Sequence, residues 1–100
     1  MSSNNWWLHR QLRIKGVQGL EQETEPLILI DRGSRFLRIY TPEPDEYVIS
    51  ADVVRKVIDL GGNLISYPVW CVGPTGDATA LAEDHGIVIQ GHGKTFGDLS

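Results

Sequence analysis

The clearest hydrophobic pattern in the chain runs over residues 50–60, where apolar side chains recur at the three- and four-residue spacing of a helix. Ser50 is suited to cap the first turn, and Gly61 and Gly62 follow the stripe, as at a left-handed helix end. The pattern therefore predicts a central buried helix whose apolar stripe faces the core: Val53, Val54, Val57, Ile58 and Leu60.

Shorter apolar runs on both sides of this helix are typical of β-strands. The runs at 27–31 and 35–40 flank the turn sequence Arg32-Gly33-Ser34 and predict an antiparallel hairpin. Further strands are expected at 47–49, 63–67 and 87–89, and loops at 18–26 and 68–76. Residues 6–14 fit a short helix better than a strand, although the alternation from Leu12 onward also fits a strand.

The second half of the chain alternates helix and strand. A short helix, capped by Thr75 or Asp77 and closed by Gly86, is expected before the last strand. Gly91-His92-Gly93 then indicates a turn, and residues 96–99 a final helical turn. Strands joined through a helix are usually parallel. The predicted fold class is therefore α/β with a mixed sheet of four to five strands: an antiparallel hairpin followed by an α-β-α-β unit, with flanking helices.

The composition of the chain bears on its number of domains and its expected compartment. One hundred residues with 41% hydrophobic and 22% charged positions predict one domain over residues 1–100, with a disordered start at 1–5. The single cysteine, Cys71, fits a reducing compartment, and the sequence begins without a signal-peptide pattern. Apolar runs are far shorter than the about 20 residues that cross a bilayer. A cytoplasmic protein without a membrane partner is expected.

The charge of the chain is mild overall but uneven. The formal net charge is −4, which argues against wholesale polyanion binding and still permits a local basic patch. Most of the basic residues lie in the first two fifths of the chain. Any contact with nucleic acid should come from the arginines of this part, which are Arg10, Arg13, Arg32, Arg35 and Arg38.

The second half also carries a family resemblance, through a glycine-ended helix, a core strand, an A-x-x-L-A-x-x-x-G-I helix and a last strand. The residues concerned are Gly61, Gly62, Asn63, Ile65, Ala78, Leu81, Ala82, Gly86, Ile87, Ile89 and Leu99. About half of the chain thereby resembles restriction-endonuclease-like domains of the Mrr type. The resemblance implies a fold used in nucleic-acid processing, with the catalytic strands at residues 27–40.

The catalytic pattern of that family is incomplete here. Its members hold a divalent metal between an acid at one strand end and an acid-x-lysine on the next strand. Asp31 matches the first acid, but no Asp-x-Lys or Glu-x-Lys occurs in the sequence. We therefore expect a small non-enzymatic binding or regulatory module without a cofactor. The alternative is a metal-dependent nuclease that uses Asp31 with acids of the 43–46 loop, Glu43 and Glu46.

Two adjacent tryptophans near the start of the chain are the last candidate feature. Trp6 and Trp7 cannot both point into one small core, whether the segment is helix or strand. Their neighbours Arg10 and Arg13 would suit single-strand binding. Aromatic residues and arginine are equally enriched at protein interfaces, and a homo-oligomer contact through Trp6 and Trp7 is the favoured interpretation.

Overall fold

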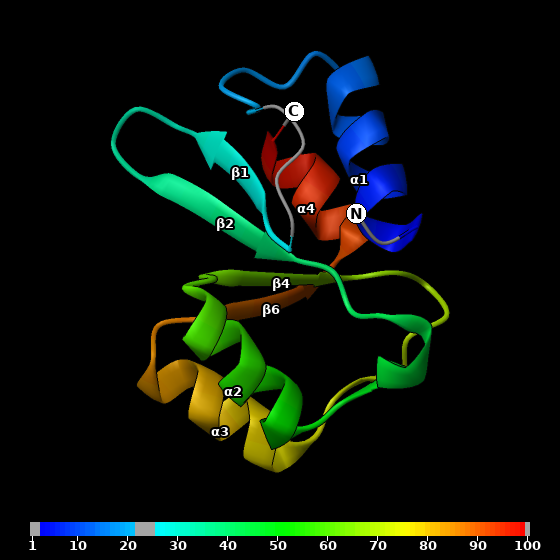
Figure 1. Ribbon diagram of the computed structural model, residues 1–100, viewed down its shortest axis with the longest axis vertical. Helices are drawn as coiled ribbons and strands as arrows, with labels where there is room; N and C mark the ends of the chain where they lie inside the picture. The colour runs from blue at the N-terminus through cyan, green and yellow to red at the C-terminus, as the bar shows by residue number, and fades with distance from the viewer. Residues whose placement is uncertain (1–2, 22–25, 100) are drawn as a thin grey trace.

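A mixed β-sheet lies between two pairs of helices in the computed structural model, which describes residues 3–21 and 26–99 (Figure 1). The first two strands form an antiparallel hairpin, and the second, third and fourth run parallel. The strands, in spatial order, are β1 (Ile28–Asp31), β2 (Phe36–Tyr40), β4 (Leu64–Tyr67) and β6 (Val88–Gly91). The predicted α/β class, with a hairpin followed by parallel strands, is confirmed.

The helices cover the two faces of this sheet (Figure 1). The crossover helices α2 (Ala51–Leu60) and α3 (Gly76–Asp84) pack on one face, and α1 (Ser3–Ile14) and α4 (His92–Leu99) on the other. Each face has its own hydrophobic cluster. Val57 and Tyr40 belong to the cluster under α2 and α3, and Leu12 and Ile39 to the cluster under α1 and α4.

Helix α2 has the predicted boundaries to within one residue. Ser50 has the extended conformation of an N-cap, although its hydroxyl makes no capping bond, and Gly61 ends the helix with a left-handed φ of 82°. Val53, Val54 and Val57 are buried. Leu60, predicted to face the core, is instead 37% exposed and does not belong to the cluster under α2. Thr75, one of the two expected caps of the next helix, accepts a hydrogen bond from the Ala78 N–H.

The predicted turn at Gly91-His92-Gly93 is wrong, because His92 and Gly93 begin helix α4. Two glycines in eight residues give this segment little helix propensity of its own. Tertiary burial stabilises the helix instead, because His92, Thr95 and Leu99 all face inward. The Thr95 hydroxyl also donates to the Gly91 carbonyl at the start of the helix.

Helix α1 includes residues 3–5, which belong to the segment 1–5 for which the sequence predicts disorder. Asn5 is 3% exposed, and its amide donates to the Pro26 carbonyl at 2.7 Å. Residues 1–2 lie outside the described residues, as does the 22–25 part of the loop expected at 18–26. None of the described helices is long and apolar enough to cross a membrane.

A small second sheet stands where the sequence indicates one strand and one loop. The strand expected at 47–49 is β3 (Val48–Ile49), and it follows a short helix, η1 (Pro44–Glu46). It pairs in parallel with β5 (Gly73–Pro74), inside the segment predicted to be a loop. The buried thiol of Cys71 donates to the Tyr47 carbonyl at 3.1 Å and helps to hold these two segments together.

Candidate functional site

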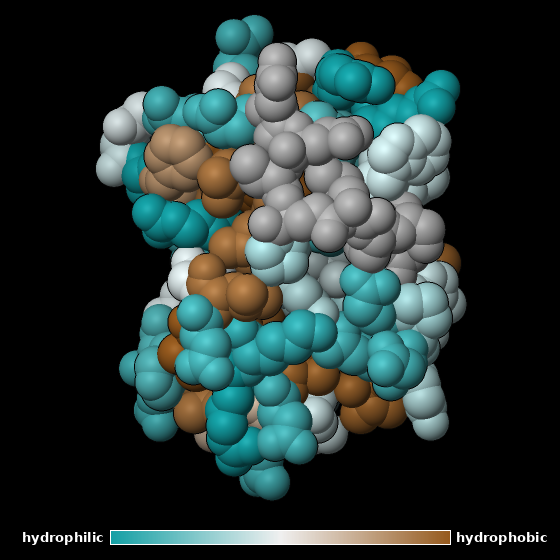
Figure 2. All heavy atoms as spheres, in the orientation of Figure 1, coloured by the Kyte–Doolittle hydropathy of each residue, from teal (hydrophilic) through white to brown (hydrophobic). Residues whose placement is uncertain are grey.

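A groove crosses the α4 face of the sheet at the amino ends of the parallel strands. It contains a hollow of about 420 Å³ whose floor is formed by Leu37, Leu64 and Val88, one residue from each parallel strand. These residues face the same side because they are paired in register or two positions from a pair. Helix α4 ends before it covers them, and Val88 is 47% exposed. Figure 2 shows an indentation on the left of the molecule with hydrophobic residues inside it.

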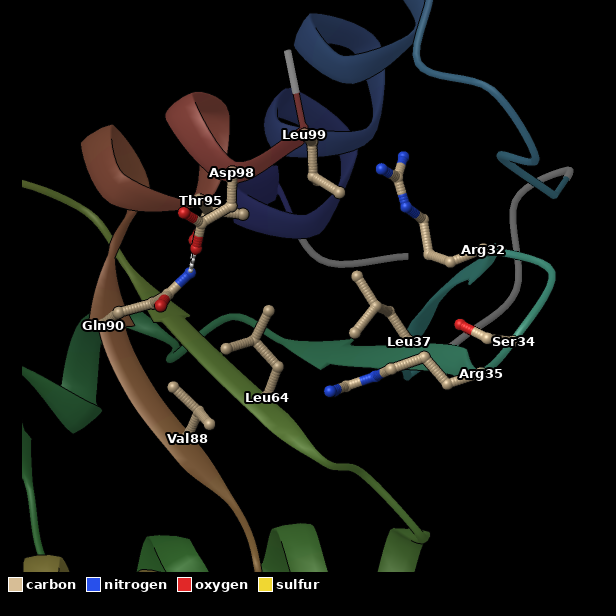
Figure 3. A pocket seen from close by; sticks show the side chains of 10 residues that line it. All are labelled: Arg32, Ser34, Arg35, Leu37, Leu64, Val88, Gln90, Thr95, Asp98 and Leu99. Carbon is tan, nitrogen blue, oxygen red and sulfur yellow. Dashed lines mark hydrogen bonds between the residues drawn. The ribbon is translucent and has the colours of Figure 1, made fainter.

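Two arginines from the hairpin turn form one wall of this hollow. Arg32 and Arg35 point from the β1–β2 turn toward the space above the strands (Figure 3). Neither side chain has an ion pair or hydrogen bond within the part of the chain that the structure describes. Their charges are therefore available to a ligand, and a guanidinium binds carboxylate or phosphate oxygens through two parallel N–H groups.

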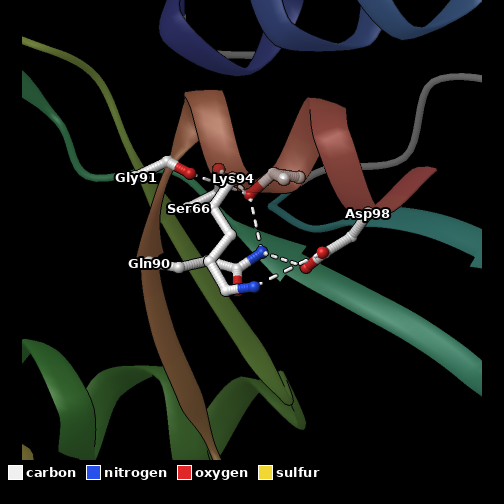
Figure 4. Close-up of polar contacts among 6 residues, drawn as sticks. Ser66, Gln90, Gly91, Lys94 and Asp98 are labelled. Atoms are coloured by element: carbon white, nitrogen blue, oxygen red, sulfur yellow. Dashed lines mark hydrogen bonds and ion pairs between the residues drawn. The ribbon is translucent and has the colours of Figure 1, made fainter. Parts of the chain in front are cut away.

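The opposite wall comes from β6 and α4. Asp98 accepts hydrogen bonds from Gln90 at 3.3 Å and Lys94 at 3.4 Å, so both of its oxygens are engaged (Figure 4). Lys94 offsets the charge of this carboxylate, and the arginines on the first wall have no acidic counterpart among the described residues. The hollow is therefore apolar at its floor and cationic along one side.

A second hollow continues the first toward the end of α1. It has a volume of about 440 Å³ and shares Arg32 and Leu99 with its neighbour. Lys15 and Asp31 also line it. We call the two together the basic groove, defined by Lys15, Arg32 and Arg35 on its rim and by Leu37, Leu64 and Val88 on its floor.

The other arginines expected to bind nucleic acid lie elsewhere. Arg38 stacks over Phe36 at 5.8 Å on the α2 side of β2, the face opposite to the groove. Arg10 lies 5.3 Å from the Trp6 ring on the exposed side of α1, and Arg13 follows one turn later. The structure thus brings Arg32 and Arg35 together but divides the five predicted arginines among three surfaces.

The acids of the alternative nuclease site are not brought together. Asp31 is paired with Phe36 at one end of β2, and Glu43 and Glu46 follow its other end. Four residue steps at about 3.3 Å each put about 13 Å between those ends. The described residues contain no group of three His, Cys, Asp or Glu side chains that could hold a metal ion. Asp31 instead accepts the Gly33 N–H and fixes the turn.

The Glu46 carboxylate is engaged in hydrogen bonds with neighbouring side chains. Its carboxylate accepts hydrogen bonds from the Tyr40 hydroxyl at 2.6 Å and from Lys56 at 3.1 Å. Burial opposes its charge, but hydrogen bonds from the Glu43 N–H, Tyr40 and Lys56 outweigh burial and lower its pKa. Burial and the bond to Glu46 raise the pKa of Tyr40 to about 12. This cluster ties η1 to β2 and α2, which is a structural role.

A buried polar network that no sequence pattern indicates lies under the start of α4 (Figure 4). The Ser66 hydroxyl is 2.6 Å from His92 Nδ1 and 2.7 Å from Thr95 Oγ1, and Gln90 donates to Thr95 at 3.0 Å. All four side chains are buried. Their order along the chain conceals the network, since Ser66 is 26 residues from His92.

One arrangement of protons satisfies every bond of this network. Thr95 donates to the Gly91 carbonyl, so its oxygen accepts from Gln90 and from Ser66. Ser66 has then given its proton away and accepts from His92 Nδ1–H. The network therefore places a proton on His92 Nδ1, and in the neutral ring the lone pair is then on Nε2. Burial lowers the pKa of His92 to about 4, which keeps the ring in this neutral form.

His92 also lines a third hollow, of about 370 Å³, at the carboxyl ends of β4 and β6. Its other lining residues are Trp7, Pro68, Val69 and Trp70. Trp7 stacks on the His92 ring with 5.8 Å between ring centroids, so one of the two predicted interface tryptophans packs within the chain. Trp6 and Trp7 remain 46% and 44% exposed, as the sequence pattern requires for at least one of them.

These surfaces carry groups that can contact a ligand. The basic groove offers guanidinium groups that are unpaired within residues 3–21 and 26–99 beside an aliphatic floor, and the third hollow offers aromatic walls beside one hydrogen-bond acceptor. The hydroxyl of Ser66 is fully buried and shares its proton with Thr95, which does not suit a nucleophile. Comparisons of the chain with protein-family models, with curated proteins and with solved structures gave no match.

Proposed function

We propose that this chain is a small non-enzymatic binding module that holds a single nucleic-acid strand in the basic groove. The observation that carries the proposal is a pair of guanidinium groups, Arg32 and Arg35, on the wall of a concave surface, neither of which has a side-chain partner among the described residues. Phosphates are the natural partners of such groups. The resemblance of the second half of the chain to restriction-endonuclease-like domains agrees with a nucleic-acid ligand.

The shape of the groove favours a single strand over a duplex. Its floor of Leu37, Leu64 and Val88 offers aliphatic contact to the faces of unstacked bases, which a paired helix keeps inside. Lys15 extends the cationic rim by one more position. With a net charge of −4 on the whole chain, the attraction is local to this rim, so binding should be modest and sensitive to salt.

The double variant Arg32→Ala, Arg35→Ala is expected to weaken oligonucleotide binding by about a hundredfold or more, because it removes two charge-assisted contacts that each contribute about 1.5 kcal/mol or more. Fluorescence anisotropy with a labelled single-stranded oligonucleotide measures it. Each phosphate contact contributes about 0.7 to the slope of log affinity against log salt for single strands. The slope should therefore become shallower by about 1.4 in the double variant.

Arg38→Ala is the matched control, since it removes an exposed arginine from the opposite face of β2. Its affinity and salt slope should equal those of the wild type, and an equal loss in both variants would contradict the groove. The oligonucleotide should also stay intact with magnesium or manganese. Cleavage that disappears in Asp31→Ala would favour the nuclease alternative.

We also propose that the chain associates with a second copy of itself through the exposed side of α1. Trp6, Arg10 and Ile14 follow one another at four-residue spacing, and Trp6 and Ile14 are 46% and 65% exposed. Arg10 stacks on Trp6, a pairing enriched at protein interfaces. Two-fold pairs are the commonest assemblies of small proteins.

Trp6→Ala is expected to shift the chain from dimer to monomer at micromolar concentration, as light scattering would show. Loss of one aromatic side chain costs about 2 kcal/mol or more at an interface, and a two-fold pair loses one from each copy, so the dimer weakens by at least about thirtyfold. Trp70→Ala removes a similarly exposed tryptophan outside α1 and should leave the dimer intact. A wild-type chain that is monomeric at these concentrations would rule the association out.

A further inference from the structure

The hollow at the carboxyl ends of β4 and β6 has the features of a site for a small ligand. Ligands of open α/β sheets bind at this end of parallel strands. Its volume of about 370 Å³ lies in the range of small-molecule sites. Trp7 and Trp70 line it with flat apolar surfaces, and both rings are 44% exposed. The hollow is separate from the basic groove, with which it shares no lining residue.

His92 places one polar atom in this apolar setting. The side chain is 8% exposed, and its Nδ1 is committed to Ser66. Nε2 makes no hydrogen bond with any described residue, yet it is not among the polar atoms that are sealed from solvent. Because the ring lines the hollow, the hollow is where this nitrogen is accessible.

The proton arrangement of the network decides what Nε2 recognises. With Nδ1 donating to Ser66, Nε2 carries a lone pair and accepts a hydrogen bond from a ligand. We propose that this hollow binds a small planar heteroaromatic molecule whose ring N–H donates to His92 Nε2 while its faces pack against Trp7 and Trp70. The low pKa of His92 supports the acceptor role, because the ring stays neutral at ordinary pH.

Selectivity follows from the same geometry. A ligand of equal shape without a donor would cover Nε2 and leave a desolvated acceptor unpaired, at a cost of about 1 to 3 kcal/mol. Indole and benzofuran are such a pair, since they differ in N–H against O in a ring system of nearly the same size. Indole should therefore bind at least about fivefold more tightly than benzofuran.

An NMR titration of the ¹⁵N-labelled chain with indole, and separately with benzofuran, tests the proposal. The unprotonated Nε2 resonance of His92 should move on addition of indole, and the shifts should saturate. Equal affinity for the two probes, or no saturable shift with indole, would overturn it. A chain whose hollow is closed by a second copy, so that indole cannot enter at any protein concentration, would also overturn it.

Two variants locate the site. His92→Phe keeps an aromatic ring against Trp7 and removes the acceptor, so indole should lose its advantage over benzofuran. Because that change also removes one of the two hydrogen bonds of Ser66, Trp70→Ala serves as a variant at an exposed position that keeps the network. It should weaken both probes equally, whereas Trp6→Ala, outside the hollow, should weaken neither. Equal weakening by Trp6→Ala would contradict the assignment.

Discussion

The Val57→Asp variant is expected to lose about 3 to 5 kcal/mol of unfolding free energy, the largest stability change of any substitution considered for this chain. Val57 is fully buried in the cluster between α2 and the sheet. Its neighbours there include Val54, Ile65 and Tyr40, so a carboxylate would enter a setting that is largely hydrocarbon. Chemical denaturation at neutral pH measures the loss.

Leu60→Asp provides the matched comparison, since it makes the same kind of change on the same helix where the side chain is 37% exposed. Its cost should be about 1 kcal/mol, close to the average for point substitutions. Similar losses in both variants would show that the acid acts on helix propensity rather than on burial. An unchanged midpoint for Val57→Asp would contradict the packing of α2 described above.

Local signals explain why so much of the second half could be predicted. The α2 segment carries a cap residue, an apolar stripe and a glycine stop within thirteen positions, and these all agree with its tertiary setting. The hairpin likewise combines alternation with the turn sequence from Arg32 to Ser34. Where local signals are weak, as at Gly91 to Gly93, tertiary burial decided the outcome and produced a helix.

The candidate sites were predictable only where their residues are close in sequence. Arg32 and Arg35 flank one turn, so the sequence already put them together. Arg38 is also close in sequence, but it alternates to the opposite face of its strand and so lies away from the groove. The hollow beside His92 draws on α1, the loop after β4 and the start of α4. No spacing rule links residues 7, 70 and 92. The packing of α1 against α4 brings Trp7 to His92, and the loop after β4 adds Trp70.

Stability should fall as the pH drops from 7 to 5, and His92 should be the cause. Burial lowers the pKa of the folded ring to about 4, whereas the ring in an unfolded chain titrates near its ordinary value of 6.5. Between those values the unfolded chain binds a proton that the folded chain does not, so acid favours unfolding. Linkage over this window gives a loss of about 2 kcal/mol by pH 5 and about 3 kcal/mol by pH 4.

The contacts of the ring explain why the folded state resists protonation. Trp7 and Phe96 face its surface, Ser66 accepts from Nδ1, and none of these groups carries a charge that could stabilise an imidazolium. Lys94, two residues further along α4, points to Asp98. Side-chain carboxylates ordinarily titrate below about pH 4.5, and the pKa of Glu46 is lowered further. Their protonation therefore affects stability below the range from pH 7 to pH 5.

Denaturation of the wild type and of His92→Phe at pH 7, 6 and 5 distinguishes the contribution of His92 to the pH dependence of stability from that of every other group. The variant keeps an aromatic side chain against Trp7 and cannot titrate, so its unfolding free energy should be lower than that of the wild type at pH 7 and nearly constant down to pH 5. His85→Gln, which changes an exposed histidine, should keep the wild-type dependence. If His92→Phe loses as much stability as the wild type between pH 7 and pH 5, the neutral buried ring is not the origin of the pH dependence, and the acceptor assigned to Nε2 loses its electrostatic support.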